Sequence, residues 1–253
     1  MTNWQTQLRT QARFSLLSFR RNPAATFFTV ILPLIFLLLF TSIFGNERLD
    51  NGARLATFYV AGILALSVIS ATMINLAITT VTKRESGILK RVRATPLRPW
   101  VYVAGEITAA LAITALMTVL VVGIGWLVFD VSVEANAIPA LVVSLVLGAA
   151  AFSALGLALT VIIPSEKAAP AVTNMISLPL YFVSDVFIIG DDTPAAVQWI
   201  GNIFPIKHLA KALGDSFNPF EPGTPFPWEH WLVIAAWGVF GVVVAAKRFR
   251  WTP

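Results

Sequence analysis

Metal binding and acid–base catalysis depend mainly on histidine, cysteine and clustered carboxylates, and these residues are sparse in this chain. The sequence has no cysteine, and its two histidines, His208 and His230, have no partners at metal-ligand spacing, so we expect both to be structural. It also lacks the G-x-x-x-x-G-K-[ST] phosphate-binding loop, the H-E-x-x-H zinc motif and the G-x-S-x-G nucleophile motif. We therefore predict no catalytic residue, no metal site and no cofactor in this chain.

The densest cluster of charge lies at residues 83–100, whose sequence is KRESGILKRVRATPLRPW. Six of these residues are Lys or Arg, and the only acid is Glu85. Apolar runs long enough to cross a bilayer flank the cluster on both sides. So strongly charged a loop cannot lie in lipid, and we expect it to form a basic surface on one face of a membrane protein.

Within this loop, residues 85–95 have the pattern of a short amphipathic helix. Such a helix would present one apolar face, formed by Ile88, Leu89 and Val92. Pro96 ends the helix, because the residue before a proline avoids the helical region. A helix of this kind across the membrane face could be gripped by a soluble partner, or it could be a topology signal that binds anionic lipid. Charge alone does not decide between them.

The composition is that of a membrane protein. Of the 253 residues, 57% are hydrophobic and 12% are charged, whereas soluble domains have about 45–50% and about 25%. The apolar residues fall in blocks of about 20, enough to cross about 30 Å of hydrocarbon. The net charge is +5, but the basic residues lie at the ends of apolar segments, so no nucleic acid is expected. The sequence predicts an all-α polytopic membrane protein.

We interpret residues 1–253 as one transmembrane domain with six membrane-spanning helices. The predicted spans are 26–44, 56–81, 101–129, 137–163, 168–189 and 228–246. Pro33 predicts a kink in the first span. A cytoplasmic loop covers residues 82–100, and an external segment covers residues 190–227.

The distribution of basic residues predicts the orientation. If the amino terminus is cytoplasmic, 14 of the 18 Lys and Arg lie on the cytoplasmic side, which is the side that they favour. We therefore expect a multi-pass protein of a bacterial cell membrane, with both termini in the cytoplasm.

Two segments outside the spans also have helical patterns. Residues 1–25 have the pattern of an amphipathic helix in the headgroup region, because Trp4, Leu8, Ala12 and Leu16 recur every four residues. Its aromatic and leucine side chains would dip into lipid; a solvated tail is the alternative. Residues 190–227 are too polar to cross the membrane and too apolar for a free loop. We expect a re-entrant pair of short helices there, capped near Thr193-Pro194 and broken at Pro205.

A few polar residues inside the predicted spans could line a translocation path. Asn75, Asn174 and Asp185 are the candidates, although hydrogen bonds between helices would also explain the amides. Glu106, near the inner end of the third span, could pair with a basic residue or simply stay hydrated. Small residues recur every four positions at Ala150, Ala154 and Ala158, and at Gly241 and Ala245, which predicts close helix packing within the subunit.

The loop motif resembles that of a known family. Residues 85–91 (ESGILKR) followed by residues 94–97 (ATPL) are similar to the E-x-G-x-x-(K/R)-R-x-x-A-T-P-(L/V) pattern of ABC type-2 transporter permeases. Within that family, the chain resembles most the drug-exporter branch that includes daunorubicin-resistance permeases. The predicted interfacial helix, the six spans and the re-entrant pair agree with this resemblance.

The resemblance implies a membrane subunit without activity of its own. It implies two copies of an ABC ATPase, which bind ATP and Mg²⁺, and a second permease subunit that forms a homodimer or heterodimer. It also implies that the 82–100 loop contains a coupling helix that docks on the ATPase, through Glu85, Gly87, Leu89, Arg91 and Pro96. The largely uncharged spans favour a hydrophobic or amphipathic cargo, such as a drug, a lipid or a glycolipid.

Two other classes of protein remain open at this stage. An ion-coupled secondary transporter would be expected to have internal repeats and buried acids, and Asp185 is the one candidate acid. A membrane-embedded enzyme would need a cluster of nucleophile, base or metal ligands, which the sequence does not contain.

Overall fold

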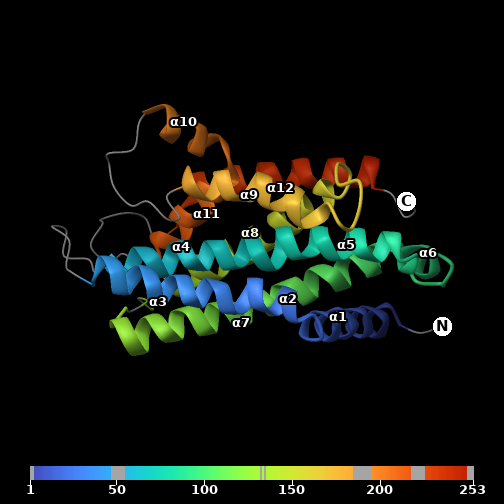
Figure 1. Ribbon diagram of the computed structural model, residues 1–253, viewed down its shortest axis with the longest axis horizontal. Helices are drawn as coiled ribbons and strands as arrows, with labels where there is room; N and C mark the ends of the chain where they lie inside the picture. Colours follow the sequence, from blue (N-terminus) through green and yellow to red (C-terminus); the bar gives the residue numbers. More distant parts are fainter. Residues whose placement is uncertain are drawn as a thin grey trace.

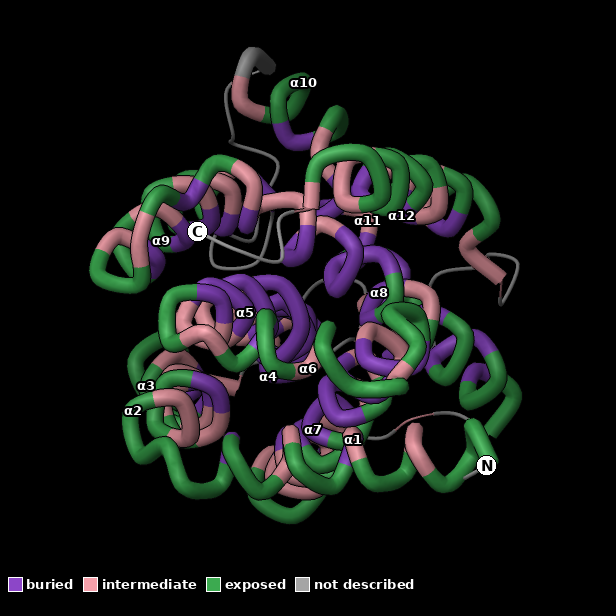
Figure 2. Tube along the Cα trace, turned by 90° about the vertical axis from the view of Figure 1, so that its right-hand side faces the viewer, coloured by how far each residue is buried: buried purple, intermediate pink, exposed green. Residues whose placement is uncertain are grey.

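The helix at the centre of the bundle is the most completely buried of the long helices. It consists of α4 (Leu55–Ile69) and α5 (Asn75–Glu85), which a π-helical turn at Ser70–Ile74 joins. Every residue of α4 except Leu55 and Phe58 is buried. A helix that is apolar on all sides becomes the core of a bundle, and Figure 2 shows α4 and α5 inside the surrounding helices. The computed structural model describes residues 3–46, 55–131, 133, 135–184, 195–217 and 226–249.

Four further long helices surround this core and run along the same axis (Figure 1). One consists of α2 (Pro23–Thr26), a π-helical turn at Phe27–Ile31 and α3 (Leu32–Phe44). The others are α7 (Pro99–Phe129), α8 (Ile138–Leu159) and α12 (Trp228–Arg248). Together with the central helix, these are the five helices of the described residues that are long and apolar enough to cross a membrane. The prediction of an all-α polytopic membrane protein is confirmed, and the described residues contain no strand.

The predicted fifth span is a shorter helix in the described residues. It corresponds to α9 (Ala169–Phe182), whose 14 residues would extend about 21 Å. Residues 185–189, the end of the predicted span, lie outside the described residues. A count of six spans therefore stays a prediction.

Pro33 marks the irregular part of the first span. Proline has no amide hydrogen to donate to the carbonyl four residues earlier, which here belongs to Thr29. The π-helical turn at Phe27–Ile31 directly precedes this position. The irregularity is consistent with the predicted kink, because π turns and prolines both interrupt regular helical bonding.

The amino-terminal amphipathic segment is helical but packs differently from the prediction. Helix α1 (Trp4–Arg20) lies against α7, and Ala12 and Phe19 are buried. Leu16 packs against the small cluster formed by Phe19, Ala71 and Ile113. Leu16, one of the side chains expected to enter lipid, therefore contacts the protein, and the location of the helix in the headgroup region stays a prediction. Trp4, another of the side chains expected to enter lipid, is exposed, as are Phe14 and Leu17.

The predicted close packing of small residues is confirmed at Ala154 and Gly241, between α8 and α12, which make the most extensive contact among the helices, whereas Ala150 is exposed. A methyl group added at Gly241 would lie 2.8 Å from the backbone carbon of Ala154. The backbones of the two helices can therefore approach this closely only because position 241 has no side chain.

The helical pair between the last two predicted spans is present as α10 (Ala195–Ile203) and α11 (Pro205–Gly214). Phe204 is extended and Pro205 begins α11, as predicted for the break. The predicted cap at Thr193-Pro194 lies outside the described residues. Helix α11 packs against α4, α8 and α12 and buries most of its side chains, including Ile206, Leu209 and Leu213.

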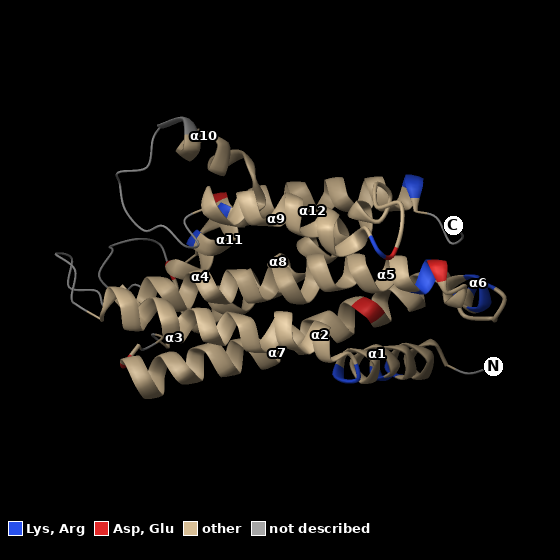
Figure 3. Ribbon diagram, in the orientation of Figure 1, with Lys and Arg blue, Asp and Glu red and all other residues tan. Residues whose placement is uncertain are grey.

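Basic residues gather at one end of the bundle (Figure 3). Helix α1, the short helix α6 (Ile88–Arg93) and the carboxyl end of α12 all lie at that end. Helices α10 and α11 lie toward the other end, where Figure 3 shows fewer basic residues.

Candidate functional site

The basic loop between α5 and α7 is a turn, a short helix and a second turn. Gly87 joins α5 to α6 with a φ of 71°, a left-handed conformation that side chains other than those of Asn and Asp rarely adopt. A Cβ atom at this position would meet no neighbouring atom within 4 Å. The glycine is therefore required for its backbone conformation and not for space.

The five residues predicted to dock on an ATPase do not all face outward. Leu89 is completely buried, and α6 packs against α5, so Leu89 anchors the short helix to the protein. Arg91 is exposed, and its guanidinium donates to the carbonyl of Ser86 at 3.3 Å. Pro96 is exposed in the turn before α7. Arg91 and Pro96 are thus available to a partner, whereas Leu89 can act only by holding α6 in place.

Two consecutive side chains at the end of α5 hold the connection between α8 and α9. The buried guanidinium of Arg84 donates to the carbonyl oxygens of Thr160 and Ile163, at 2.9 and 2.8 Å. The carboxylate of Glu85 accepts a hydrogen bond from the backbone amide of Glu166 at 2.9 Å. We call these three hydrogen bonds the Arg84–Glu85 clamp. A movement of α5 that preserves the clamp must also move residues 160–166.

A second set of polar contacts ties the other end of the loop to α1. The buried carboxylate of Glu106, on α7, receives hydrogen bonds from Gln11 at 2.8 Å and Ser15 at 2.6 Å. It also forms an ion pair with Lys83 on α5, at 2.8 Å. The expectation that Glu106 pairs with a basic residue is confirmed. One carboxylate therefore joins α1, α5 and α7.

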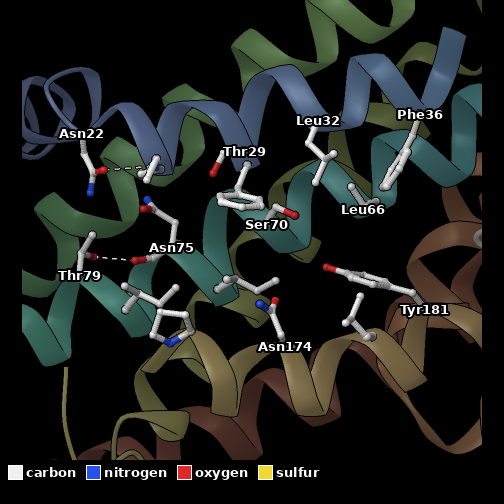
Figure 4. Close-up of a pocket in the computed structure, with 17 residues that line it drawn as sticks. Asn22, Thr29, Leu32, Phe36, Leu66, Ser70, Asn75, Thr79, Asn174 and Tyr181 are labelled. Atoms are coloured by element: carbon white, nitrogen blue, oxygen red, sulfur yellow. Dashed lines mark hydrogen bonds between the residues drawn. The ribbon is translucent and has the colours of Figure 1, made fainter. Parts of the chain in front are cut away.

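A cavity of about 310 Å³ lies between the first span, the central helix and α9 (Figure 4). One wall is formed by α2, α3 and the π turn between them. The second is formed by α4, α5 and the π turn that joins these two helices, and the third by α9. This volume is at the lower end of the range of about 300–1,000 Å³ that is typical of small-molecule sites.

The structure brings together two of the three residues predicted to line a path. Asn75, on α5, and Asn174, on α9, both line the cavity, as do Ser70 and Thr79 (Figure 4). The two residues are 99 positions apart in the sequence, so their convergence depends on the fold. Asp185, the third candidate, lies outside the described residues.

The chemistry of the cavity is that of an apolar site with scattered hydrogen-bonding groups. Phe28, Leu32, Phe36 and Leu66 are among its apolar walls. Among the described residues that line it, none is Asp, Glu, Lys or Arg. Such a lining can bind an apolar body through contact area and orient it through amides and hydroxyls.

The cavity and the basic loop share a helix. Asn75 and Thr79 line the cavity from the first part of α5, and Arg84 and Glu85 form the clamp at its end. Ten residues of helix between Asn75 and Glu85 correspond to about 15 Å. The clamp also holds the segment that leads into α9, which lines the cavity through Asn174. Two walls of the cavity are therefore connected to the loop.

Sequence reasoning missed the role of Arg84, because one arginine in a cluster of six basic residues gives no sign that it is buried. It also missed the meeting of His208 and His230, whose Nδ1 atoms lie 3.0 Å apart. Only the sequence positions of the two residues, His208 in the predicted external segment and His230 at the start of the span that follows it, hinted that they could be neighbours.

The fold, the loop and the cavity together fit a membrane subunit of an ABC transporter, and comparison with known proteins agrees. Residues 6–217 match the model of the ABC-2 type transporter family, and the chain belongs to that family. It is 27% identical over 245 residues to the daunorubicin resistance ABC transporter permease protein DrrB1 of Streptomyces coeruleorubidus. That similarity covers 93% of this chain and 82% of the relative.

Proposed function

We propose that this chain is the permease subunit of an ATP-driven exporter, which moves a hydrophobic or amphipathic cargo outward across the cytoplasmic membrane. A drug, a lipid or a glycolipid would fit this description. ATP and Mg²⁺ bind to two copies of a separate ABC ATPase, and a second permease subunit, identical or related, completes the pathway. Both termini and the basic loop face the cytoplasm.

The observation that carries the proposal is the uncharged cavity whose α5 wall continues into the basic loop. An exporter subunit needs a place for cargo and a mechanical connection from that place to its ATPase. The lining with Asn75 and Asn174 supports the first requirement. The Arg84–Glu85 clamp supports the second, because it ties α5 to the segment before α9. The relative from Streptomyces, named as a daunorubicin resistance permease, supports a cargo of the same broad class.

In the proposed cycle, the ATPase grips the exposed side of α6 and moves it when ATP binds. Leu89 and the packing of α6 on α5 transmit this displacement to α5. The clamp then carries the displacement to α9, so that the two walls holding Asn75 and Asn174 move relative to the first span. This movement switches the cavity from inward to outward access.

The test is purification in a gentle detergent, with identification by mass spectrometry of the proteins that accompany the chain. The wild type is compared with Arg91→Glu, which reverses an exposed charge on α6. Arg13→Glu is the matched control, because Arg13 is an exposed arginine on α1, outside the loop. We expect an ATPase with a Walker motif to accompany the wild type and Arg13→Glu and to be lost from Arg91→Glu.

Recovery of the same ATPase with Arg91→Glu would contradict docking through the loop. A wild-type preparation without any ATPase would contradict the proposed function and favour an ion-coupled secondary transporter. The direction and the cargo need a second experiment, in which the complex is reconstituted in vesicles. ATP on the side of the ATPase should drive a fluorescent amphipathic dye to the opposite side.

A further inference from the structure

The two histidines of the chain lie on different helices and meet. His208 belongs to α11 and His230 to α12, 22 residues later. Their Nδ1 atoms are 3.0 Å apart, with the rings tilted by 58°. The sequence contains only these two histidines and no cysteine. Both of its imidazole side chains therefore lie at the same place in the fold.

A backbone carbonyl fixes the tautomer of one ring. Nε2 of His208 lies 2.9 Å from the carbonyl oxygen of Asn202. Because a carbonyl oxygen can only accept a hydrogen bond, Nε2 carries the hydrogen, and Nδ1 of the neutral ring presents a lone pair toward His230. Histidine ligands of metal ions typically have this arrangement, in which the second ring nitrogen donates to a carbonyl or carboxylate.

The spacing of the two nitrogens is close to that of a metal site. Imidazole nitrogens bind Zn²⁺ at about 2.0–2.1 Å, and two of them at a tetrahedral angle are about 3.4 Å apart. Metal binding would lengthen the observed 3.0 Å by a few tenths of an ångström and would turn the two rings so that both Nδ1 lone pairs point at the ion. Both residues are half-buried, so one side remains open for water molecules to complete the coordination. Lys211 follows His208 by three residues and Glu229 directly precedes His230, so one charge of each sign lies near the pair in sequence.

The two helices are held together independently of the histidines. Trp237, on α12, donates from Nε1 at 2.8 Å to the carbonyl of Ile203, the last residue of α10, and so ties the connection just before α11 to α12. Its ring also stacks on Phe204, with the centroids 5.8 Å apart. Helix α11 packs against α12 as well. These contacts position both imidazoles before any ion binds, which lowers the entropy cost of forming a site.

We propose that His208 and His230 form a site for a divalent transition-metal ion, with Zn²⁺ as the representative ion. Both Nδ1 atoms bind the ion, and the proton on Nδ1 of His230 moves to its Nε2. The bound ion joins α11 to α12 at the end of the bundle opposite the basic loop. Imidazole favours Zn²⁺, Cu²⁺ and Ni²⁺ over Mg²⁺ and Ca²⁺, so the site would discriminate against the abundant hard cations.

The test is calorimetric titration of the purified chain with Zn²⁺, and with Mg²⁺ for comparison, after treatment with a chelator. The affinity tag must contain no histidine. The variants are His230→Asn, whose amide can still donate to Nδ1 of His208, and His208→Gln, whose amide can still donate to the carbonyl of Asn202. Both variants preserve hydrogen bonding and remove an imidazole ligand.

We expect the wild type to bind one Zn²⁺ ion per chain saturably and to ignore Mg²⁺. Each variant should bind Zn²⁺ more than about tenfold more weakly. Zn²⁺ should also raise the midpoint of thermal unfolding of the wild type and not that of the variants. Absence of saturable Zn²⁺ binding, or equal binding by the wild type and both variants, would overturn the site and leave a histidine–histidine hydrogen bond. Neither result depends on transport, so the proposed function is tested separately.

Discussion

At the scale of single residues, the two cavity amides give a direct test of the cargo site. Asn174→Leu should leave membrane insertion and ATPase binding intact but weaken the apparent affinity for a cargo with hydrogen-bonding groups. One hydrogen bond contributes about 0.5–1.5 kcal/mol, so the loss should be up to about tenfold. The measurement is the concentration dependence of transport in reconstituted vesicles. Asn75→Leu should behave similarly, because it lines the same cavity.

Met175→Leu is the matched control for these variants. Met175 follows Asn174 on α9, is 70% exposed and is not among the described residues that line the cavity. The Met175→Leu variant should transport the cargo with the same apparent affinity as the wild type. An effect of Met175→Leu equal to that of Asn174→Leu would contradict a specific role for the amide.

Glu106 provides a second prediction at the residue scale. Glu106→Gln keeps the shape of the side chain but leaves Lys83 without its ion-pair partner. Because a buried polar group without a partner costs about 1–3 kcal/mol, we expect the free energy of unfolding in detergent to fall by about that amount. Lys83→Met in the same chain should recover part of the loss, since the unpaired charge is then removed. Strict additivity of the two substitutions would show that the pair is not coupled.

At the scale of elements, the Arg84–Glu85 clamp separates docking from transmission. Arg84→Lys keeps the charge, but an ammonium cannot present two donors in the fork that holds the carbonyls of Thr160 and Ile163. The ATPase should still accompany the chain, because Arg84 is buried and cannot contact a partner directly. ATP-driven transport should fall about fivefold or more, as expected for the loss of a coupling free energy.

The control for this variant is Arg93→Lys, because Arg93 is exposed on α6. We expect it to retain most transport. Two results would contradict transmission through the clamp: normal transport by Arg84→Lys, or loss of the ATPase from it.

Some helices could be predicted from the sequence much better than others. The spans that are long and continuously apolar, such as Pro99–Phe129, could be predicted nearly to the residue, because lipid requires an unbroken apolar helix. Helix α9 could not, because its described part is short and contains Pro179. The packing of α1 on α7 was also missed. Periodicity identifies an apolar stripe, but it does not say whether protein or lipid covers it.

The candidate site was predictable only in part for the same reason. Gly87 could be recognised from a local motif, and Asn75 and Asn174 from their polarity within apolar helices. The burial of Arg84 and Leu89 depends on the position of residues far away in the sequence. No pattern within a single segment contains that information.

At the scale of the whole molecule, the orientation can be tested because the chain has no cysteine of its own. A single cysteine is introduced either by Lys90→Cys on α6 or by Trp199→Cys on α10, and both positions are exposed. The excess of Lys and Arg at the end that carries α6 predicts that this end is cytoplasmic. A membrane-impermeant maleimide should therefore label Trp199→Cys in intact cells and Lys90→Cys only after permeabilisation. The reverse labelling pattern would place the basic loop outside the cell, where a cytoplasmic ATPase could not reach it. That result would contradict both the predicted orientation and the proposed coupling to an ATPase.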